Sequence, residues 1–492
     1  MIQNSTGMPN FSCFIGKNQT FRLLVGSVFM FFGFVLHSQE LPPIVNYPTK
    51  TYGGGNQNWA ISQDADKFIY VGNNEGLLEF NGAKWQLYPS PNKTIIRSVF
   101  AKGDRIYTGS YRDFGFWERH STGALAYTSL SEKLSLQLVE DEHFWNIIAY
   151  GHWVLFQSLD RIYMYNAQTG QASFIEAGST LTKVFKLGNA IYYHVLNEGL
   201  FTIENGSGKQ LSAAAVFKDD RLIQLFELGG TTYAVTQKNG VYALANNLPT
   251  PWDVPANNIL KKVSVYSGIQ LQDGSIMLGT IANGVYHISS KGEVLFQINQ
   301  YNGLGNNTAL TLFEDFENNV WVGLDNGIDC INIEAAYTNY VDQAGSLGTV
   351  YAAAQFRDNL YLGTNQGLFV REMASKQDFK LIANTQGQVW NLKKIDGQLF
   401  CGHNSGTFLI EGHNALKTAE VAGTWDIKKI EGRDDLLLQG NYTGLYVLKN
   451  TNGSWELRNK LEGFDISSRY FEITAAQDKI IVNHEYKGVY EL

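Results

Sequence analysis

The chain has 492 residues, of which 44% are hydrophobic and 17% are charged, and its formal net charge is −8. This length allows more than one domain, and the composition excludes wholesale disorder because enough apolar side chains are present to build a large core. The acidic balance, without any long basic cluster in the sequence, argues against binding to nucleic acid. Aromatic residues make up 13% of the chain and glycines number 49, a mixture that suits short strands and tight turns.

A signal peptide is predicted over residues 1–38. Two basic residues precede an apolar run from Leu23 to Leu36, and a small-residue cleavage site follows at Ser38. A run of this length suits the core of a signal peptide better than a membrane-spanning helix, and an uncleaved anchor is the alternative. No second long apolar run follows in the sequence, so we expect the rest of the chain to be exported and soluble.

One sequence motif of about a dozen residues recurs along the rest of the chain. In its clearest copy, Asn319–Cys330, an apolar strand ends in Gly323, a polar turn follows, and Gly327 opens a second apolar strand. Looser copies carry the second glycine at Gly199, Gly240, Gly284, Gly444 and Gly488, and together with Gly327, Gly367 and Gly406 these glycines stand about 40 residues apart. A period of this length, with strands inside it, is typical of the blades of a β-propeller.

The residues of the motif fit the interpretation that each repeat is a propeller blade. Each blade of a propeller is covered on both faces by its neighbours, so its central strands can be apolar throughout, as Val320-Trp321-Val322 is. The turn between the strands needs a positive φ, which glycine and asparagine adopt at low cost, and Gly327 stands at such a position.

In chain order the repeats predict eleven blades. The first seven contain the strands Phe68–Gly72, Arg105–Gly109, Trp153–Gln157, Ala190–Val195, Thr231–Val235, Ser275–Gly279 and Val320–Gly323, and the last four have second strands starting at Leu360, Leu399, Leu436 and Ile480. We therefore predict an all-β chain of tandem β-propellers with four-stranded blades. A seven-bladed propeller is expected over residues 39–345, and four blades of a second, incomplete propeller over residues 346–492.

Two further expectations concern closure. Ile44–Tyr47 is the candidate strand that closes the first ring, beside Gly327–Ile331, because a strand from one terminus usually completes the blade of the other. Four blades do not make a complete ring, so we expect the chain to be the front part of a longer protein or a shortened gene product.

The mature chain contains two cysteines, Cys330 and Cys401, in different repeats. Both lie in apolar strands, so we expect two free thiols rather than a disulfide, and the cysteine spacing is not that of a metal site. The sequence predicts neither a metal site nor a cofactor.

Several short sequence segments around the seventh blade resemble the repeat of the two-component regulator propeller family. They are Gly303-Leu304-Gly305-Asn306-Asn307-Thr308, Phe313-Glu314-Asp315, Asn318-Asn319-Val320-Trp321-Val322-Gly323 and Asn326-Gly327-Ile328. The predicted first, eighth and ninth blades match the second half of that repeat, whereas the second and third match poorly.

The resemblance implies an extracytoplasmic sensor of a signal-transducing transcriptional regulator in Bacteroidetes, often one that senses carbohydrate breakdown products. It implies two propellers, a triple-tyrosine β-sandwich, one span in the inner membrane, and a histidine kinase or a helix-turn-helix as output. The sequence contains no motif of the output parts, so sensing on the periplasmic side is the role expected of this chain.

Candidate ligand-binding residues stand in the second and third blades. Tyr111, Arg112 and Asp113 replace the ordinary turn of the second blade, and Trp145 lies in a similar aromatic stretch of the third. A charged pair beside aromatic rings suits a sugar or an aromatic ligand, although aromatic residues in strands are more often core packing.

Two other functions remain open. The chain could be a protein-interaction scaffold, or a propeller lyase or glycosidase. A glycosidase needs two carboxylates that face one sugar, and the acidic residues of this sequence stand mostly in turns, so we expect no catalytic residues.

Overall fold

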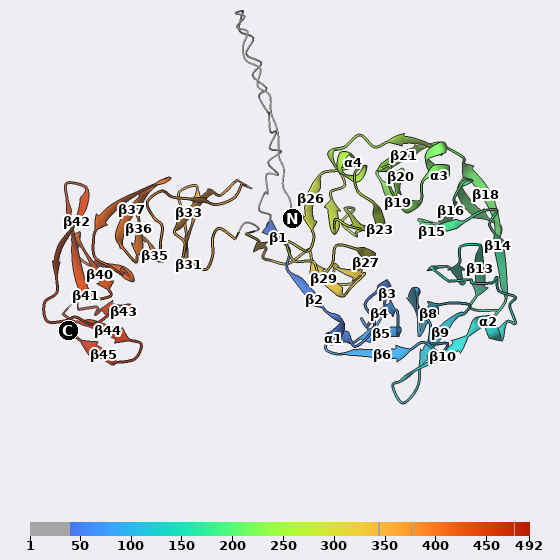
Figure 1. The fold of residues 1–492 in the computed structure, drawn as a ribbon, viewed down its shortest axis with the longest axis horizontal. Coiled ribbons are helices and arrows are strands. Elements are labelled where there is room, and N and C mark those ends of the chain that lie inside the picture. The colour runs from blue at the N-terminus through green and yellow to red at the C-terminus, as the bar shows by residue number, and fades with distance from the viewer. Residues whose placement is uncertain (1–39, 343–344, 376, 477) are drawn as a thin grey trace, which may run out of the picture. The chain divides into compact units, whose positions relative to one another are not determined.

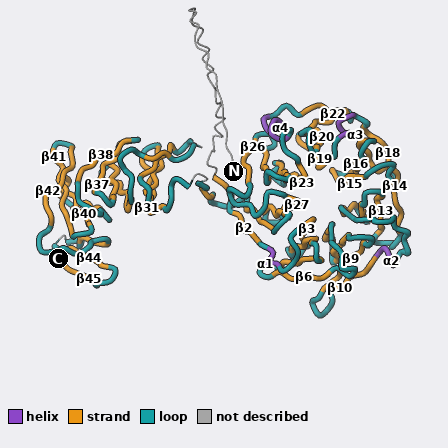
Figure 2. Tube along the Cα trace, in the orientation of Figure 1, coloured by secondary structure: helices purple, strands orange, loops and turns teal. Residues whose placement is uncertain are grey.

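The computed structural model describes residues 40–492 except 343, 344, 376 and 477. The regular secondary structure of the described chain is almost entirely β-strand, drawn in orange in Figure 2, and turns and loops connect the strands. The helices in it are short: α1 (Thr49–Tyr52), α2 (Leu130–Lys133), α3 (Ala215–Asp219) and α4 (Pro255–Leu260). The predicted signal peptide lies outside the described residues. No helix in the described part is both long and apolar enough to cross a membrane.

Residues 44–332 form seven four-stranded antiparallel sheets. The first three are β3 (Asn58–Gln63), β4 (Ile69–Asn73), β5 (Gly76–Phe80) and β6 (Trp85–Pro89); β7 (Ser98–Lys102), β8 (Arg105–Gly109), β9 (Phe114–Arg119) and β10 (Leu125–Ser129); and β11 (Asn146–Tyr150), β12 (Trp153–Gln157), β13 (Arg161–Asn166) and β14 (Ala172–Glu176). The next three are β15 (Leu181–Leu187), β16 (Ala190–Val195), β17 (Gly199–Glu204) and β18 (Ser207–Ser212); β19 (Leu222–Leu228), β20 (Thr231–Thr236), β21 (Val241–Ala245) and β22 (Leu248–Pro251); and β23 (Val265–Gln270), β24 (Ile276–Thr280), β25 (Val285–Ile288) and β26 (Val294–Ile298). The seventh combines β27 (Ala309–Glu314), β28 (Asn319–Leu324) and β29 (Ile328–Asn332) with β2 (Ile44–Tyr47).

The seven sheets surround a common centre (Figure 1). The innermost strand is the first one of each sheet along the chain, except in the seventh sheet, where it is β27 and the strand β2 lies outermost. The innermost strands follow one another in the order β3, β7, β11, β15, β19, β23 and β27, and β27 lies against β3 again. The all-β fold of four-stranded antiparallel blades is therefore confirmed. The domain boundaries at residues 38, 345 and 492 stay predictions.

The strand that closes this ring comes from the amino-terminal end of the described chain. β2 pairs antiparallel with β29, with Ile44 opposite Ile331 and Tyr47 opposite Ile328, so the predicted closing strand is confirmed. The ring of Tyr47 stacks on that of Trp321 at 5.7 Å and also contacts Phe80 of the first sheet. Aromatic packing therefore joins the seventh sheet to the first. Next to this seam, β1 (Glu40–Leu41) pairs with β30 (Asn339–Tyr340).

The tight turns of the repeat need glycine for the predicted reason. Gly327 has φ +105°, and Gly76, at the same place in the first sheet, has φ +153°. A side chain at Gly76 would also collide with its neighbour, because a Cβ atom there would lie 2.2 Å from the carbonyl oxygen of Tyr88.

Residues 350–491 form four further sheets. They contain β31 (Val350–Phe356), β32 (Asn359–Thr364), β33 (Leu368–Glu372) and β34 (Lys380–Leu381); β35 (Val389–Ile395), β36 (Gln398–His403), β37 (Gly406–Glu411) and β38 (Asn414–Ala419); β39 (Asp426–Ile430), β40 (Arg433–Asn441), β41 (Gly444–Thr451) and β42 (Ser454–Lys460); and β43 (Tyr470–Ile473), β44 (Ile480–His484) and β45 (Gly488–Glu491). The last sheet has three strands. From the incomplete ring one would expect the outer face of this last sheet to be exposed at Tyr470 and Phe471, which is wrong for Phe471: it is buried in a cluster with Leu438 and Val482, whereas Tyr470 is exposed.

Both cysteines of the described chain are free, as expected. Cys401 is buried in β36, and Cys330 is partly buried in β29. Burial raises the pKa of the Cys330 thiol to about 12, so this thiol is protonated at neutral pH.

Candidate functional site

A β-bulge at the start of the innermost strand leaves one extra residue in five of the seven blades. In β3, the pairing register shifts between Asn58 and Ala60, which leaves Trp59 as the extra residue. The same shift occurs in β15, β19, β23 and β27, at Thr182, Ile223, Tyr266 and Leu310. A bulge re-aims the side chain of its extra residue, and bulges of this kind are common beside active sites.

The second and third blades place their corresponding residues just before the strand. The backbone N–H of Arg97 donates to Gly109 at 2.9 Å, and that of Trp145 donates to Gln157 at 2.8 Å. In the strand pairing, Gly109 and Gln157 also lie opposite Ser98 and Asn146, the first residues of β7 and β11. Arg97 and Trp145 therefore occupy the position of the extra residue in these two blades.

These residues surround a central cavity of about 390 Å³. All seven of them line it: Trp59, Arg97, Trp145, Thr182, Ile223, Tyr266 and Leu310. The volume lies within the range of small-molecule sites, roughly 300–1,000 Å³. Every blade of the ring therefore contributes to one cavity, and the aromatic and cationic residues of blades one to three are neighbours in it.

The guanidinium of Arg97 lies against two tryptophan rings. Its Cζ atom is 4.5 Å from the ring centroid of Trp59 and 4.2 Å from that of Trp145. The two rings are nearly perpendicular, at 82° with their centroids 6.0 Å apart, so the guanidinium lies in the corner that they form, where both π systems attract the cation. The Nε and Nη1 atoms at its edge are buried and have no hydrogen-bond partner among the described residues. Burial lowers the pKa of Arg97.

Two more cations line the cavity, and no carboxylate does. Lys183 and Arg221 are the other charged residues among the described residues that surround it. Lys183 is partly buried by the surrounding protein, and this desolvation lowers its pKa to about 8. Burial also raises the pKa of Tyr266, an effect that the nearby charges of Arg97 and Arg221 oppose.

The predicted site residues are divided between this cavity and its surroundings. Trp145 lines the cavity, whereas Tyr111, Arg112 and Asp113 do not. The Tyr111 hydroxyl donates to Asp141 at 2.8 Å, and the exposed Arg112 anchors the turn through its backbone N–H, which donates to Glu142 at 2.7 Å.

Asp113 accepts hydrogen bonds inside the second blade. The hydroxyls of Tyr127 and Ser129 donate to its carboxylate at 2.9 and 2.7 Å, and Ser131 donates as well. This arrangement ties the turn to β10 and α2. As ligand-binding residues, the four remain predictions.

Tyr111 still connects to the cavity wall through aromatic contacts. Its ring lies 4.9 Å from that of His143, which lies 6.1 Å from that of Trp145. A rearrangement of this turn would therefore reach Trp145 through one intervening ring.

Trp59, Arg97, Lys183, Arg221 and Tyr266 were not predicted from the sequence. Trp59, Arg97 and Tyr266 occupy equivalent positions at the start of the first strand, so aligning this strand of every repeat, rather than the glycine turn, would have brought them into one column. Lys183 follows that position by one residue in its blade, and Arg221 precedes it by two. Their residue types differ from blade to blade, which hides the column from a search for recurring motifs.

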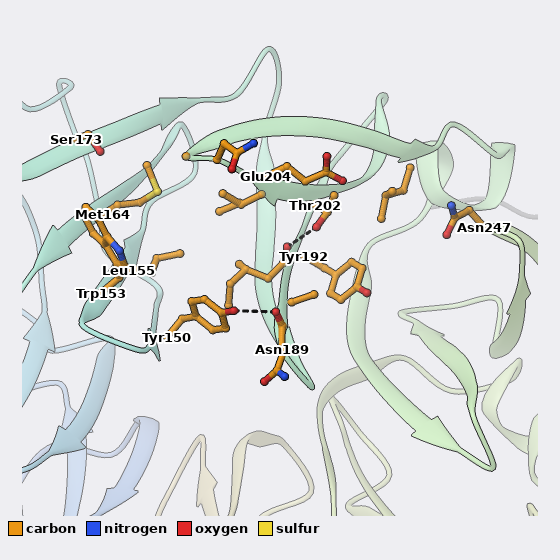
Figure 3. A pocket seen from close by; sticks show the side chains of 16 residues that line it. Tyr150, Trp153, Leu155, Met164, Ser173, Asn189, Tyr192, Thr202, Glu204 and Asn247 are labelled. Carbon is orange, nitrogen blue, oxygen red and sulfur yellow. Dashed lines mark hydrogen bonds between the residues drawn. The ribbon is translucent and has the colours of Figure 1, made fainter.

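A larger groove of about 860 Å³ lies between the third and fourth blades, away from the central cavity (Figure 3). Trp153, Leu155 and Met164 form one part of its wall, and the Tyr150 hydroxyl donates to the Asn189 carbonyl at 3.0 Å. The charged residue of its lining, Glu204, is paired with Lys209 at 3.0 Å. This carboxylate is thus already paired, whereas the cations of the central cavity form no salt bridge with a described residue, and the central cavity is the better candidate site.

Comparison with known proteins shows the fold. No protein-family model and no curated protein matches the chain. The structure is similar to the extracellular domain of BT3049 from B. thetaiotaomicron, described as a hybrid two component system, with a TM-score of 0.69 and 16% identity over 92% of this chain. The extracellular domain of BT4673 from B. thetaiotaomicron gives 0.47 and 15% over 93% of this chain and 66% of its own, and a streptogramin B lyase gives 0.46 and 14% over 60% of this chain and 98% of its own.

The chain spans 65% of the length of the BT3049 structure. That structure is an extracellular domain of the class of regulator that the repeat motif resembles. At this identity the likeness establishes a shared propeller fold.

Proposed function

We propose that this chain is the extracytoplasmic ligand-sensing region of a signal-transducing transcriptional regulator, and that it binds a carbohydrate-derived ligand in the central cavity of its first ring. The observation that carries the proposal is the guanidinium of Arg97, which lies against Trp59 and Trp145 and whose buried Nε and Nη1 atoms have no partner among the described residues. A buried donor without an acceptor costs roughly 1–3 kcal/mol, and a ligand that accepts from it recovers this cost.

The chemistry of the cavity favours binding over catalysis. Hydrolysis of a glycosidic bond needs two carboxylates roughly 5–10 Å apart, and no Asp or Glu stands among the described residues that line the cavity. Aromatic rings with a few converging polar groups are the usual composition of a recognition site. Recognition without chemical conversion is what a sensor requires.

The proposed setting is the periplasm. A signal peptide over residues 1–38 exports the region, and further domains after it anchor the full-length protein in the inner membrane and carry its output. Support comes from the extracellular domain of BT3049, which has the same fold and belongs to a protein described as a hybrid two component system. Those further domains are the proposed partners of this region.

A thermal-shift screen of neutral and acidic oligosaccharides against the chain tests this proposal. We expect some members of the panel to raise the melting temperature of the wild type, and Trp145→Ala to abolish those shifts. Trp153→Ala is the matched control, because this tryptophan lies in the outer groove with 38% of its side chain exposed. Absence of a shift with every oligosaccharide would instead favour a protein-interaction scaffold.

A further inference from the structure

The central cavity is cationic in a chain that is acidic as a whole. The chain has a formal net charge of −8, yet the charged residues lining the cavity in its described part are Arg97, Lys183 and Arg221. Like charges in one low-dielectric space repel one another, and Arg97 and Lys183 also lose hydration because they are partly buried, whereas Arg221 is exposed. An arrangement of this kind costs stability unless an anion enters.

Nothing in the described protein neutralises these cations. None of the three takes part in a salt bridge with a described residue, whereas Arg119 pairs with Glu79 and Arg105 with Glu118 within the same ring. The tryptophan rings beside Arg97 attract the guanidinium through their π systems but offer no oxygen or nitrogen acceptor to its N–H groups. The N–H groups without a partner thus call for an acceptor.

Oxyanions are hydrogen-bond acceptors that suit a guanidinium. Carboxylate, sulfate and phosphate groups accept parallel N–H bonds from an arginine edge, and a nearby ammonium strengthens the binding as a point charge. Blades five to seven supply Ile223, Tyr266 and Leu310 to the same cavity, which offers an apolar surface to the body of a ligand.

We infer that the ligand of the central cavity is an acidic sugar, whose carboxylate or sulfate group binds the edge of Arg97 with Lys183 and Arg221 beside it. This inference rests on the proposed function, because it names the class of ligand for the same cavity. Carboxylate and sulfate share the required chemistry, and the experiments below separate them.

The first experiment needs no sugar. The melting temperatures of the wild type and of Arg97→Gln are compared in sodium sulfate and in sodium chloride at equal ionic strength. Sulfate stabilises proteins generally by exclusion from their surface, so the informative quantity is the difference between the variants. We expect sulfate to add several degrees more to the wild type than to Arg97→Gln, with Lys186→Gln, whose side chain is exposed, behaving like the wild type.

The second experiment measures binding by calorimetry. Matched oligosaccharides carrying a uronate, a sulfate ester or neither are titrated into the wild type, Arg97→Gln and Lys183→Met. We expect an acidic member to bind at least 10-fold more tightly than its neutral counterpart, and Arg97→Gln to lose about 10- to 100-fold for the acidic member alone, the scale of a lost charged hydrogen bond. Whether the uronate or the sulfate ester binds identifies the acid group.

Lys183→Met keeps the inference testable if Arg97→Gln does not fold. An anion next to Lys183 raises its pKa, so binding at pH 8.5 should take up protons in the wild type and not in Lys183→Met. The other titratable groups near the cavity are Arg97, Arg221 and Tyr266, with His143 and His194 behind its wall. Burial lowers the pKa of both histidines, so they are already neutral at pH 8.5.

Three results decide the matter. Tight binding confined to acidic oligosaccharides, with proton uptake, supports the inference. Equal binding of neutral and acidic members in the cavity overturns it and leaves the proposed sensing function standing. Binding of no oligosaccharide, together with equal sulfate effects on the wild type and Arg97→Gln, overturns both.

Discussion

The guanidinium carbon of Arg97 lies 4.2 Å from the ring centroid of Trp145, although the two residues open the innermost strands of different blades. The contact crosses a blade boundary at the wall of the central cavity. A desolvated cation–π pair stabilises by up to roughly 2 kcal/mol. This contact holds the side chain in place, and the Nε and Nη1 atoms of Arg97 have no hydrogen-bond partner among the described residues.

The central cations should lower stability at neutral pH. Because folding lowers the pKa of Lys183 from 10.5 to about 8, the unfolded chain binds more protons than the folded chain between these values. Stability attributable to this residue therefore rises as the pH increases from about 8 to 10.5. We expect Lys183→Met to raise the free energy of unfolding by roughly 1–3 kcal/mol at pH 7, and this gain to disappear by about pH 10.5.

Urea denaturation of the ligand-free chain at several pH values measures this effect. Lys186→Met in the same strand is the matched control, because Lys186 is exposed and should change stability by no more than about 0.5 kcal/mol. A gain for Lys183→Met that did not vary with pH would mean that packing, and not charge, explains it.

Asp113 should matter for the stability of the second blade. Asp113→Ala removes the acceptor of the Tyr127, Ser129 and Ser131 hydroxyls, which leaves these donors without their partner. We expect a loss of about 2–4 kcal/mol in the free energy of unfolding. Arg112→Ala, one residue earlier and exposed, should cost less than about 0.5 kcal/mol. Equal denaturation midpoints for the two variants would remove the structural role of this carboxylate.

The seam between the first and seventh blades should depend on Tyr47. Its ring lies within 5.7 Å of Phe80, Trp85 and Trp321, so Tyr47→Ala loses aromatic packing on both sides of the seam. We expect a cost of about 2–4 kcal/mol by equilibrium denaturation. Val45→Ala in the same strand should be nearly neutral, because Val45 is 53% exposed. If the closing strand contributed little, the two variants would unfold together.

The two arrays should behave differently when produced separately. Residues 40–345 contain the closed ring, and we expect them to be a soluble monomer. Residues 348–492 end in a sheet with an open edge, where Val489 is 68% and Tyr486 is 90% exposed. Exposed apolar edges associate, so this piece should be insoluble or oligomeric. A monomeric 348–492 with a cooperative thermal transition would show that the predicted boundary or number of blades is wrong.

The fold was accessible from the sequence because its determinants are local and repeated. The glycine turns, such as the one at Gly327, and the apolar central strands recur at a fixed period, and each copy reports the same backbone requirement. Even the closing strand β2 could be predicted, because ring closure leaves few candidates near a terminus.

The site was less accessible because its residues do not repeat. Trp59, Arg97 and Tyr266 share a backbone position but no residue type, and a bulge shows itself in strand pairing and not in the sequence. Trp145 was found through its aromatic neighbourhood. Asp113 was singled out because a charged residue replaced the usual turn, and the structure shows its carboxylate bonded to hydroxyls of its own blade.

Whether an acidic sugar binds at Arg97 in the central cavity can be seen in a crystal structure of the chain with the tightest-binding oligosaccharide of the panel. We expect electron density for the sugar in the central cavity, with an acidic oxygen within hydrogen-bond distance of Nε or Nη1 of Arg97. Density in the outer groove beside Trp153, with the edge of Arg97 still unoccupied, would contradict it.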